Sequence, residues 1–470
     1  MSTSNLALAT QANNATPEIL LTLDREDRRR LRSQLEGQLR QAIQEGRLVA
    51  GSALPASRTL ARDLGISRSV VVDAYGQLVA DGYLEARQGS ATRVCASGGD
   101  PQPRQPAATP EPALRARFVG GLPDPSLFPR REWLRLYRAA LDDVADPDLG
   151  YPGPFGAPSL RAALAAYLGR VRGVSGSEAR TLVTTGFTQG LVLVSRALRA
   201  RGVTEMAVED PCFGLHRQAI ANAGLRPVPV PVDEDGIDVE RLAATGAGAV
   251  LVAPAHSYPT GAVLSPARRN ALIAWARRRD AVVVEDDYDA EFRYDRTPVA
   301  ALQGLDPDRV VYAGCASKTL TPALRLGWLV APDHLLGGIA REKTLDDMGT
   351  PLLEQLALAR FVAGGSFARH LRRVRPVYAR RRDAALEALR DALPRARPRG
   401  VAAGLHLYAE LPPGTAEHDL VARARERGVL LEGAAWHWAD PASAPPALVI
   451  GYGSLGEAAI RRGLALVASL

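Results

Sequence analysis

The sequence predicts a chain of two folded parts: a small winged helix-turn-helix domain, and a larger α/β domain that ends in a smaller α+β lobe. Three observations lead to this fold class. Short helical patterns followed by a hairpin pattern come first, a segment rich in proline and glycine follows, and apolar strands alternating with amphipathic helices occupy the rest. A length of 470 residues also favours more than one hydrophobic core.

The small domain is predicted over residues 21–96. Apolar residues recur at helical spacing over 31–43, and a second, shorter helix ends at Gly65. Ser67 can cap a third helix, which the strand patterns YLEAR and TRV follow. This order of a helix, a helix-turn-helix and a hairpin predicts a winged helix-turn-helix.

Polar side chains stand where such a domain would contact DNA. The N-terminal residues of the second motif helix face base edges in the major groove, and residues 67–69 hold that place here. Arg58 opens the preceding helix, where it can approach a phosphate, and the hairpin tip is suited to the minor groove or the backbone. The predicted DNA-contacting residues are Arg58, Ser67, Arg68, Ser69, Arg87, Gln88 and Ser90. The pattern alone leaves open that the arginines only form a solvated surface.

The stretch from Gly46 to Val94 resembles the GntR family of bacterial regulators. The pattern LPxSRxLAxxLGxSRxxVxxAYxxLxxxGYL runs almost unbroken through it. One departure is Ala91, where the subgroup usually has a glycine at the tip of the wing. The resemblance implies binding to double-stranded operator DNA. The net charge of +7 permits such binding but is too small to predict it by itself.

The remaining boundaries follow from composition. Residues 1–20 read as a polar tail, and residues 97–117 as a linker rich in proline, glycine and small residues. The larger domain is predicted over 118–470, with its smaller lobe beginning near residue 366. The three cysteines lack metal spacing, and no apolar run is long enough to span a bilayer. We therefore expect a cytoplasmic protein without a metal site or a membrane contact.

The larger domain alternates apolar strands with amphipathic helices. Because the strands are apolar throughout, they predict a buried, mostly parallel sheet, and ligands of such sheets lie beyond the carboxyl ends of the strands. The predicted strands are residues 181–185, 206–210, 249–254, 281–287, 309–314 and 326–331.

Reactive side chains follow several of these strands. Only two lysines occur in the chain: Lys318 follows a strand, whereas Lys343 lies in a charged helical stretch that reads as solvated. The turn at 185–189, which includes Phe187, can offer backbone N–H groups to a phosphate. The other candidates are Asp286 and Tyr288 at a strand end, Thr188, Ser317 and Arg325 as anion donors, and Phe213 as a stacking ring. An amine, a carboxylate, anion donors and a stacking ring are what pyridoxal phosphate (PLP) requires. Each residue also has an ordinary alternative as a surface charge, a helix cap or a core aromatic.

This region resembles fold-type I aminotransferases, and with the N-terminal motif the chain resembles the MocR subgroup of GntR regulators over most of residues 21–470. The likeness is carried by YPGPFGAPSLRAALAAYL, TTGFTQGL, EDPCFG, PAHSYPTGAVLS, VVVEDDYDAEFRY and ASKTLTPALRLGWLV. It implies a PLP-binding, head-to-tail homodimer. The residues that it places around PLP are Lys318 as the imine lysine, Asp286 on the pyridine nitrogen, Tyr288 on the ring oxygen, Thr188, Ser317 and Arg325 at the phosphate, Phe213 under the ring, Tyr258 at its border, and Tyr151 of the partner subunit.

One departure from the family bears on function. Aminotransferases, and regulators that sense an amino acid, tend to carry an arginine for the substrate carboxylate in the C-terminal phrase ALVIGYGSL. The positions around Val449 offer no arginine here, and another arginine, such as Arg217, could take that role. The sequence therefore predicts a transcription regulator with PLP as its effector, similar to the PdxR-type regulators of vitamin B6 synthesis. Two alternatives stay open: a regulator that senses an amino acid or another amine through PLP, and an active aminotransferase with a DNA-binding appendage.

Overall fold

The structure is a computed structural model that describes residues 21–24, 31–86, 91–95, 114–295 and 299–468. It divides into two compact units, one on each side of the boundary between residues 111 and 112. Each unit has a hydrophobic core of its own and is described by itself.

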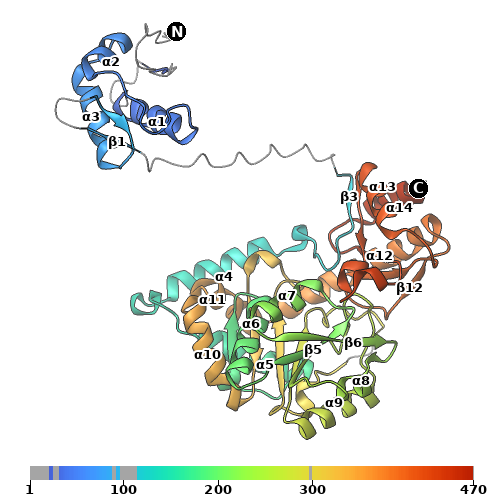
Figure 1. Ribbon diagram of the computed structural model, residues 1–470. Helices are drawn as coiled ribbons and strands as arrows, with labels where there is room; N and C mark the ends of the chain where they lie inside the picture. The colour runs from blue at the N-terminus through green and yellow to red at the C-terminus, as the bar shows by residue number, and fades with distance from the viewer. Residues whose placement is uncertain (1–20, 25–30, 87–90, 96–113, 296–298, 469–470) are drawn as a thin grey trace. The chain divides into compact units, whose positions relative to one another are not determined.

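The N-terminal unit is a winged helix-turn-helix, as predicted (Figure 1). Gly65 ends its second helix with a φ of 62°, a left-handed conformation that glycine adopts at little cost. The helices bury Leu39, Leu60 and Leu78 in one core. The elements are helices α1 (Leu31–Gln44), α2 (Ser57–Leu64) and α3 (Arg68–Ala80), followed by the antiparallel strands β1 (Leu84–Glu85) and β2 (Arg93–Val94).

The C-terminal unit is built on an eight-stranded, mostly parallel sheet, to which all six predicted strands belong. Its strand order is β4–β11–β10–β9–β8–β5–β6–β7, with β11 and β7 antiparallel to their neighbours. The strands are β4 (Thr181–Thr184), β5 (Glu205–Asp210), β6 (Arg226–Asp233), β7 (Gly236–Ile237), β8 (Ala249–Val252), β9 (Val282–Asp287), β10 (Val310–Cys315) and β11 (Gly327–Val330).

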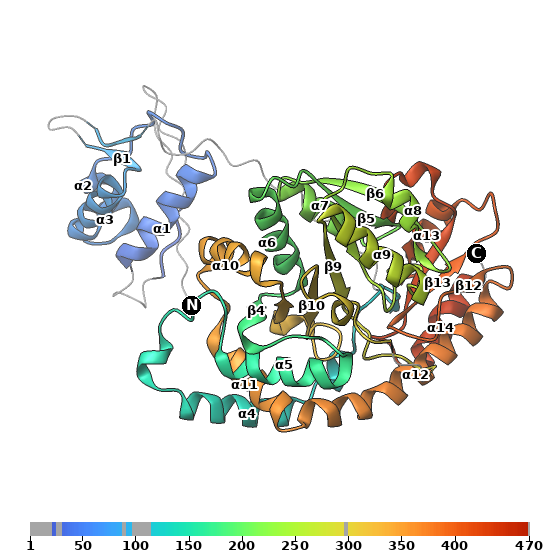
Figure 2. The same cartoon turned by 90° about the horizontal axis from the view of Figure 1, so that it is seen from below.

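Helices cover both faces of this sheet, which makes three layers (Figures 1 and 2). Helices α6 (Phe187–Ala200), α7 (Gly214–Asn222) and α10 (Asp333–Asp347) pack on one face. The other face is covered by α4 (Arg130–Asp143), α5 (Pro158–Arg172), α8 (Val239–Ala243), α9 (Pro266–Arg279) and α11 (Leu352–Ala363). Within the described ranges, every helix is too short or too polar to cross a lipid bilayer.

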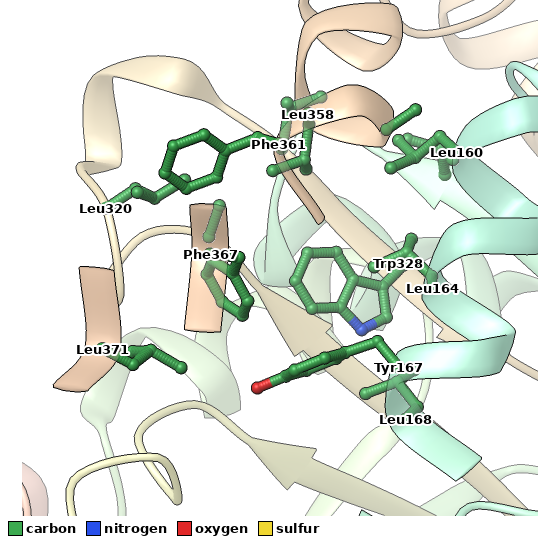
Figure 3. Close-up of a cluster of buried hydrophobic side chains, with 14 of the residues drawn as sticks. Leu160, Leu164, Tyr167, Leu168, Leu320, Trp328, Leu358, Phe361, Phe367 and Leu371 are labelled. Atoms are coloured by element: carbon green, nitrogen blue, oxygen red, sulfur yellow. The ribbon is translucent and has the colours of Figure 1, made fainter. Parts of the chain in front are cut away.

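One aromatic-rich cluster on the second face includes Leu320, which lies two residues after Lys318 (Figure 3). Tyr167 and Phe367 meet edge to face with ring centroids 5.1 Å apart. Leu320 and Leu326, which lie on either side of the turn after Lys318, are buried in the same cluster. Packing of this kind restricts the turn to one conformation, so that the lysine has a defined position.

The smaller lobe has a four-stranded antiparallel sheet of its own in the order β12–β13–β16–β15. Helix α12 (Ser366–Ala392) serves both lobes: Phe367 packs with the large sheet, whereas Leu389 packs in the small lobe (Figure 2). The other elements are β12 (Arg397–Arg399), β13 (His406–Glu410), α13 (Glu417–Glu426), β14 (Val429–Leu430), β15 (Glu432–Gly433), β16 (Ala447–Gly451) and α14 (Glu457–Ala468).

The end of the predicted linker at residue 117 is corrected by the structure. Strand β3 (Ala116–Arg117) pairs with β14, and Ala116 and Phe118 are buried in the core of the small lobe. Arginine and apolar residues alternate from Arg115 to Phe118, which is the period of a half-buried strand. Because this short alternation directly follows the proline-rich segment, composition alone does not separate it from the linker.

Candidate DNA-reading surface and ligand cavity

The predicted DNA-reading residues that the structure describes are exposed at one part of the N-terminal unit. Arg58 lies in the first turn of α2, and Arg68 and Ser69 begin α3. Ser67 takes the N-cap position of α3, but its hydroxyl contacts the Ser69 hydroxyl at 2.9 Å instead of capping a backbone N–H. Both hydroxyls therefore stay near the surface. Arg87, Gln88 and Ser90 lie outside the described residues.

Replacing Arg68 with alanine is expected to weaken DNA binding by about 1–3 kcal/mol if its side chain reads a base, because the base edge then loses its donor. The measurement is fluorescence anisotropy on a duplex selected from a random-sequence pool by the full-length protein. Arg32→Ala is the control, because Arg32 lies on α1 in an ion pair with Glu36. Equal losses in both variants would contradict the assignment of the reading surface.

Nine of the ten residues predicted to surround PLP line one cavity of about 440 Å³ in the C-terminal unit. These are Phe187, Thr188, Phe213, Tyr258, Asp286, Tyr288, Ser317, Lys318 and Arg325. Several lie at or shortly after the ends of strands: Asp286 is the second-last residue of β9, Phe213 follows β5, and Lys318 follows β10. The cavity therefore lies beyond the carboxyl ends of the parallel strands, where ligands of such sheets bind.

Asp286 is a buried carboxylate whose Oδ1 atom has no hydrogen-bond partner in the described structure. Burial raises its pKa well above the usual value, and the neighbouring Asp287 and Asp289 add to this rise. An unpartnered carboxylate oxygen in a buried place is costly unless a donor meets it. The cavity thus presents an unsatisfied acceptor that a cationic group or an N–H donor of a ligand could bind.

The Tyr288 phenol is oriented by two buried residues behind it. Its hydroxyl lies 3.1 Å from Nδ1 of His256, and the same nitrogen lies 2.9 Å from Oδ2 of Asp289. All three side chains are buried. A phenol held in this way at the cavity wall can hydrogen-bond a ligand oxygen in a set direction.

Groups that can bind an anion lie at the connection between β4 and α6. Gly186 takes a φ of 105° before the helix, and a Cβ there would lie 3.2 Å from the Arg325 guanidinium. Arg325 itself has a φ of 51°, which is uncommon for a residue other than glycine and is enriched at functional sites. Together with Thr188 and Ser317, this end offers a guanidinium, hydroxyls and the start of a helix to a phosphate.

The environment of Lys318 agrees with the sequence prediction, whereas that of Lys343 does not. Lys318 reaches the cavity, and a Cβ on Gly121 would lie 3.3 Å from its Nζ. Lys343, which reads as solvated in the sequence, is fully buried and pairs with Asp347 at 2.6 Å. Lys343 lies on α10, which packs against α6, and a charged sequence context does not reveal this packing.

The family assignment rests on comparison with known proteins. Residues 31–94 match the gntR family of bacterial regulatory proteins, and residues 135–432 match aminotransferase class I and II. The protein named "Probable rhizopine catabolism regulatory protein MocR" of Rhizobium meliloti is 35% identical over 77% of this chain and 78% of its own length. The chain belongs to the MocR subfamily of GntR regulators.

Two further relatives agree with this assignment. The pyridoxine biosynthesis regulator PdxR of Corynebacterium glutamicum is 33% identical over 92% of this chain and 94% of its own length. The structure of a kynurenine aminotransferase from Pyrococcus horikoshii, solved with PMP, superposes with a TM-score of 0.70 at 27% identity, covering 76% of this chain and 90% of that one. This MocR-type protein is therefore a helix-turn-helix transcription regulator with a fold-type I aminotransferase domain.

Several residues of this regulator line the cavity although the sequence prediction did not assign them to the ligand. They are Val119, Gly120, Gly121, Leu122, His216, Cys315, Pro322, Glu432 and Trp436. A Cβ on Gly120 would clash with the Tyr258 hydroxyl, so the glycine is required for the close approach. Glu432 stands alone as an acid in the apolar run VLLEGAAW, and that isolation was the available signal.

The structure offers no carboxylate-binding arginine at the position of Val449, and Arg217 is already engaged in this regulator. Val449 is a buried residue of β16. Arg217 donates hydrogen bonds to the backbone carbonyls of His437 at 2.6 Å and Trp438 at 2.7 Å. Its guanidinium thus supports the loop after β15 instead of facing a ligand, and Arg217 is not a replacement for the missing arginine.

Tyr151 is the one predicted PLP residue that does not line the cavity. Its side chain is 83% exposed, and it borders a different surface depression beside α4 and α11. The expectation from the family was a contact with the cofactor phosphate of a partner subunit, for which an exposed tyrosine is available.

Proposed function

We propose that this regulator binds PLP in the Lys318 cavity and that bound PLP changes its affinity for operator DNA. The observation that carries the proposal is the unpartnered, buried Oδ1 of Asp286, for which the protonated pyridine nitrogen is a suitable donor. Lys318 and Arg325 line the same cavity, where they provide an amine for the aldehyde and a cation for the phosphate. When bound, PLP supplies an electrophilic carbon that reacts with amines.

The exposed position of Tyr151 supports a head-to-tail homodimer, in which the tyrosine of one subunit reaches the cofactor phosphate of the other. A dimer presents two winged helix-turn-helix units, and their separation has to match the spacing of the two operator half-sites. A change of that separation on PLP binding would alter operator affinity without any contact between PLP and DNA.

PLP itself is the effector that we favour, and control of vitamin B6 synthesis is the corresponding role. Two facts support this choice. The ligand end of the cavity offers no arginine to a substrate carboxylate among the described residues, and a relative that covers nearly the whole chain is named for pyridoxine biosynthesis.

Operator affinity is expected to change at least about fivefold when PLP alone is added, since couplings between sites usually amount to 1–3 kcal/mol. Anisotropy titrations of the selected duplex with the full-length protein, with PLP and with pyridoxal lacking the phosphate, measure the effect. Pyridoxal is the control for simple reaction with surface amines. If the visible absorption band shows that PLP is bound and the operator affinity is still unchanged at saturating PLP, PLP is ruled out as the sole effector.

A second candidate function is the sensing of an amine through bound PLP. The cavity favours it, because Glu432 and Trp436 line a part of the wall that the cofactor does not require. A response to PLP that appears only after an amine is added identifies this case. Sustained turnover with common amino donors would instead identify an active aminotransferase.

A further inference from the structure

The cavity of this regulator contains a carboxylate that PLP does not use. Glu432 lies on β15, directly opposite Val449 in the register of β15 and β16. Val449 is the position at which amino-acid-binding relatives were expected to carry an arginine for the substrate carboxylate. An acid next to that position reverses the charge that a ligand meets there.

Glu432 is fixed by hydrogen bonds from several donors. Its oxygens accept from the backbone N–H of Gly120 at 2.8 Å, from Nε2 of His437 at 3.0 Å and from Nε1 of Trp436 at 3.3 Å. Its side chain is only 13% exposed. Burial alone would raise the pKa of this carboxyl, but the hydrogen bonds from His437 and Gly120 outweigh it and hold the pKa below the usual value. The carboxylate is therefore ionised.

His437 helps to hold the Glu432 side chain in place. Its Nε2 lies 3.0 Å from a carboxylate oxygen, and its Nδ1 is buried without a hydrogen-bond partner in the described structure. His437 is not among the residues that line the cavity, so a ligand there meets the carboxylate of Glu432 and not the imidazole.

The cations that line the cavity are already assigned. Among the described lining residues, Lys318 and Arg325 are the cationic ones, and both belong to the proposed PLP site. His216 is neutral, because burial and the charges of Lys318 and Arg217 lower its pKa to about 3. A ligand carboxylate near Glu432 would meet a like charge, and no further cation stands among the described lining residues.

Aromatic rings complete the surroundings of Glu432. Trp436 is 40% exposed at the cavity wall and meets the ring of Phe213 with centroids 5.5 Å apart. Tyr258 also lines the cavity, with its hydroxyl 3.4 Å from Glu432. A carboxylate beside aromatic faces is the combination that recognises ammonium groups.

We infer that the second ligand of this site is a short aliphatic diamine: one amine lies toward Lys318, and the ammonium at the other end binds Glu432 beside Trp436. The inference rests on the proposed function, because it places a ligand next to bound PLP. Gly120 donates its backbone N–H to Glu432, and the adjacent Gly121 lies close to Nζ of Lys318, so both ends of the ligand site border the same pair of glycines.

Three ligands with the same chain and different ends test the inference on the full-length, PLP-loaded protein: putrescine, butylamine and γ-aminobutyrate. Putrescine is expected to bind at least about tenfold more tightly than butylamine by calorimetry, which is the gain of one charge-assisted contact, and γ-aminobutyrate most weakly. Operator binding is expected to shift at the lowest concentration of putrescine, at a higher concentration of butylamine and at the highest concentration of γ-aminobutyrate. Equal affinities, or tightest binding of γ-aminobutyrate, would overturn the inference, and this ranking needs no variant.

Two variants locate the effect. Glu432→Gln keeps the shape and the acceptor oxygen, and is expected to reduce the preference for putrescine over butylamine to less than about threefold. Glu426→Gln removes the same charge from an exposed position on α13 and should keep the wild-type preference. A wild-type preference in Glu432→Gln contradicts the inference. Absence of the PLP absorption band in the wild type contradicts the proposed function instead, so that the two failures are distinguishable.

Discussion

Replacing Lys318 with alanine is expected to abolish the visible absorption band that PLP produces with this regulator. Lys318 is the one lysine that lines the cavity, and an amine is required for a covalent link to the cofactor aldehyde. The remaining hydrogen bonds and the phosphate contacts can still hold PLP, but we expect its dissociation constant to rise at least about a hundredfold, because the bound aldehyde loses its covalent partner. Spectrophotometric titration with PLP measures both quantities.

Lys343→Arg is the matched control, since it removes the only other lysine amine and keeps the charge that pairs with Asp347. This variant should keep the band with wild-type intensity. A band that survives in Lys318→Ala would show that another amine, such as the N-terminus, reacts with PLP. Absence of a band in the wild type would mean that the cavity binds a different ligand. The class of that ligand would then have to be inferred from the carboxylates of Glu432 and Asp286.

The parts of this protein that depend on short-range patterns were predictable from the sequence. The helix-turn-helix is set by apolar spacing and by Gly65, and the six predicted strands are continuous apolar runs. The cavity-lining residues that were predicted come after those strands or at the start of a helix, and parallel-sheet topology brings such positions together. Resemblance to a known family then attached roles to residue types that have ordinary alternatives.

Strand β6 shows why some of the fold was not predictable in this way. Its segment RPVPVPVD contains three prolines, which usually exclude a strand inside a sheet. The prolines alternate, however, and a parallel pair takes the N–H groups of every second residue toward one neighbour. The ladder with β5 can therefore run through Val228 and Val230, while the prolines face the side where only the short β7 pairs.

Glu432 shows the corresponding limit for the site. It reaches the cavity from the small lobe, far along the chain from Lys318, and only the pairing of β15 with β16 places it beside Val449. No local pattern contains that juxtaposition. The same holds for the buried Lys343, which lies on α10 where that helix packs against α6. Long-range packing, not local propensity, decides both.

Loss of the Arg172 side chain is expected to destabilise the C-terminal unit by about 3–5 kcal/mol, the range typical of breaking a buried ion pair. Arg172 ends α5 and forms a two-point contact with Asp287, at 2.8 Å and 3.1 Å. Both side chains are more than nine-tenths buried, and Tyr312 donates a further hydrogen bond to Asp287 at 2.6 Å. In Arg172→Ala, the carboxylate of Asp287 would stay buried with its main partner gone.

Urea unfolding followed by tryptophan fluorescence measures this loss in the right unit, because all five tryptophans lie between residues 133 and 438. Arg461→Ala is the control: its pair with Glu387 is more than half exposed on both sides, and such pairs change stability by less than about 1 kcal/mol.

A second substitution separates the charge from the cavity that a missing side chain leaves. Asp287→Asn in the Arg172→Ala background should recover part of the lost stability, because the buried charge is then removed while the cavity remains. No recovery would mean that lost packing, and not the unpaired carboxylate, causes the effect. Asp287 directly follows Asp286 at the end of β9. The Arg172→Ala single variant should therefore also bind PLP more weakly than the wild type, at temperatures where the variant is still folded. The ion pair would then support both the sheet and the carboxylate that faces the cofactor.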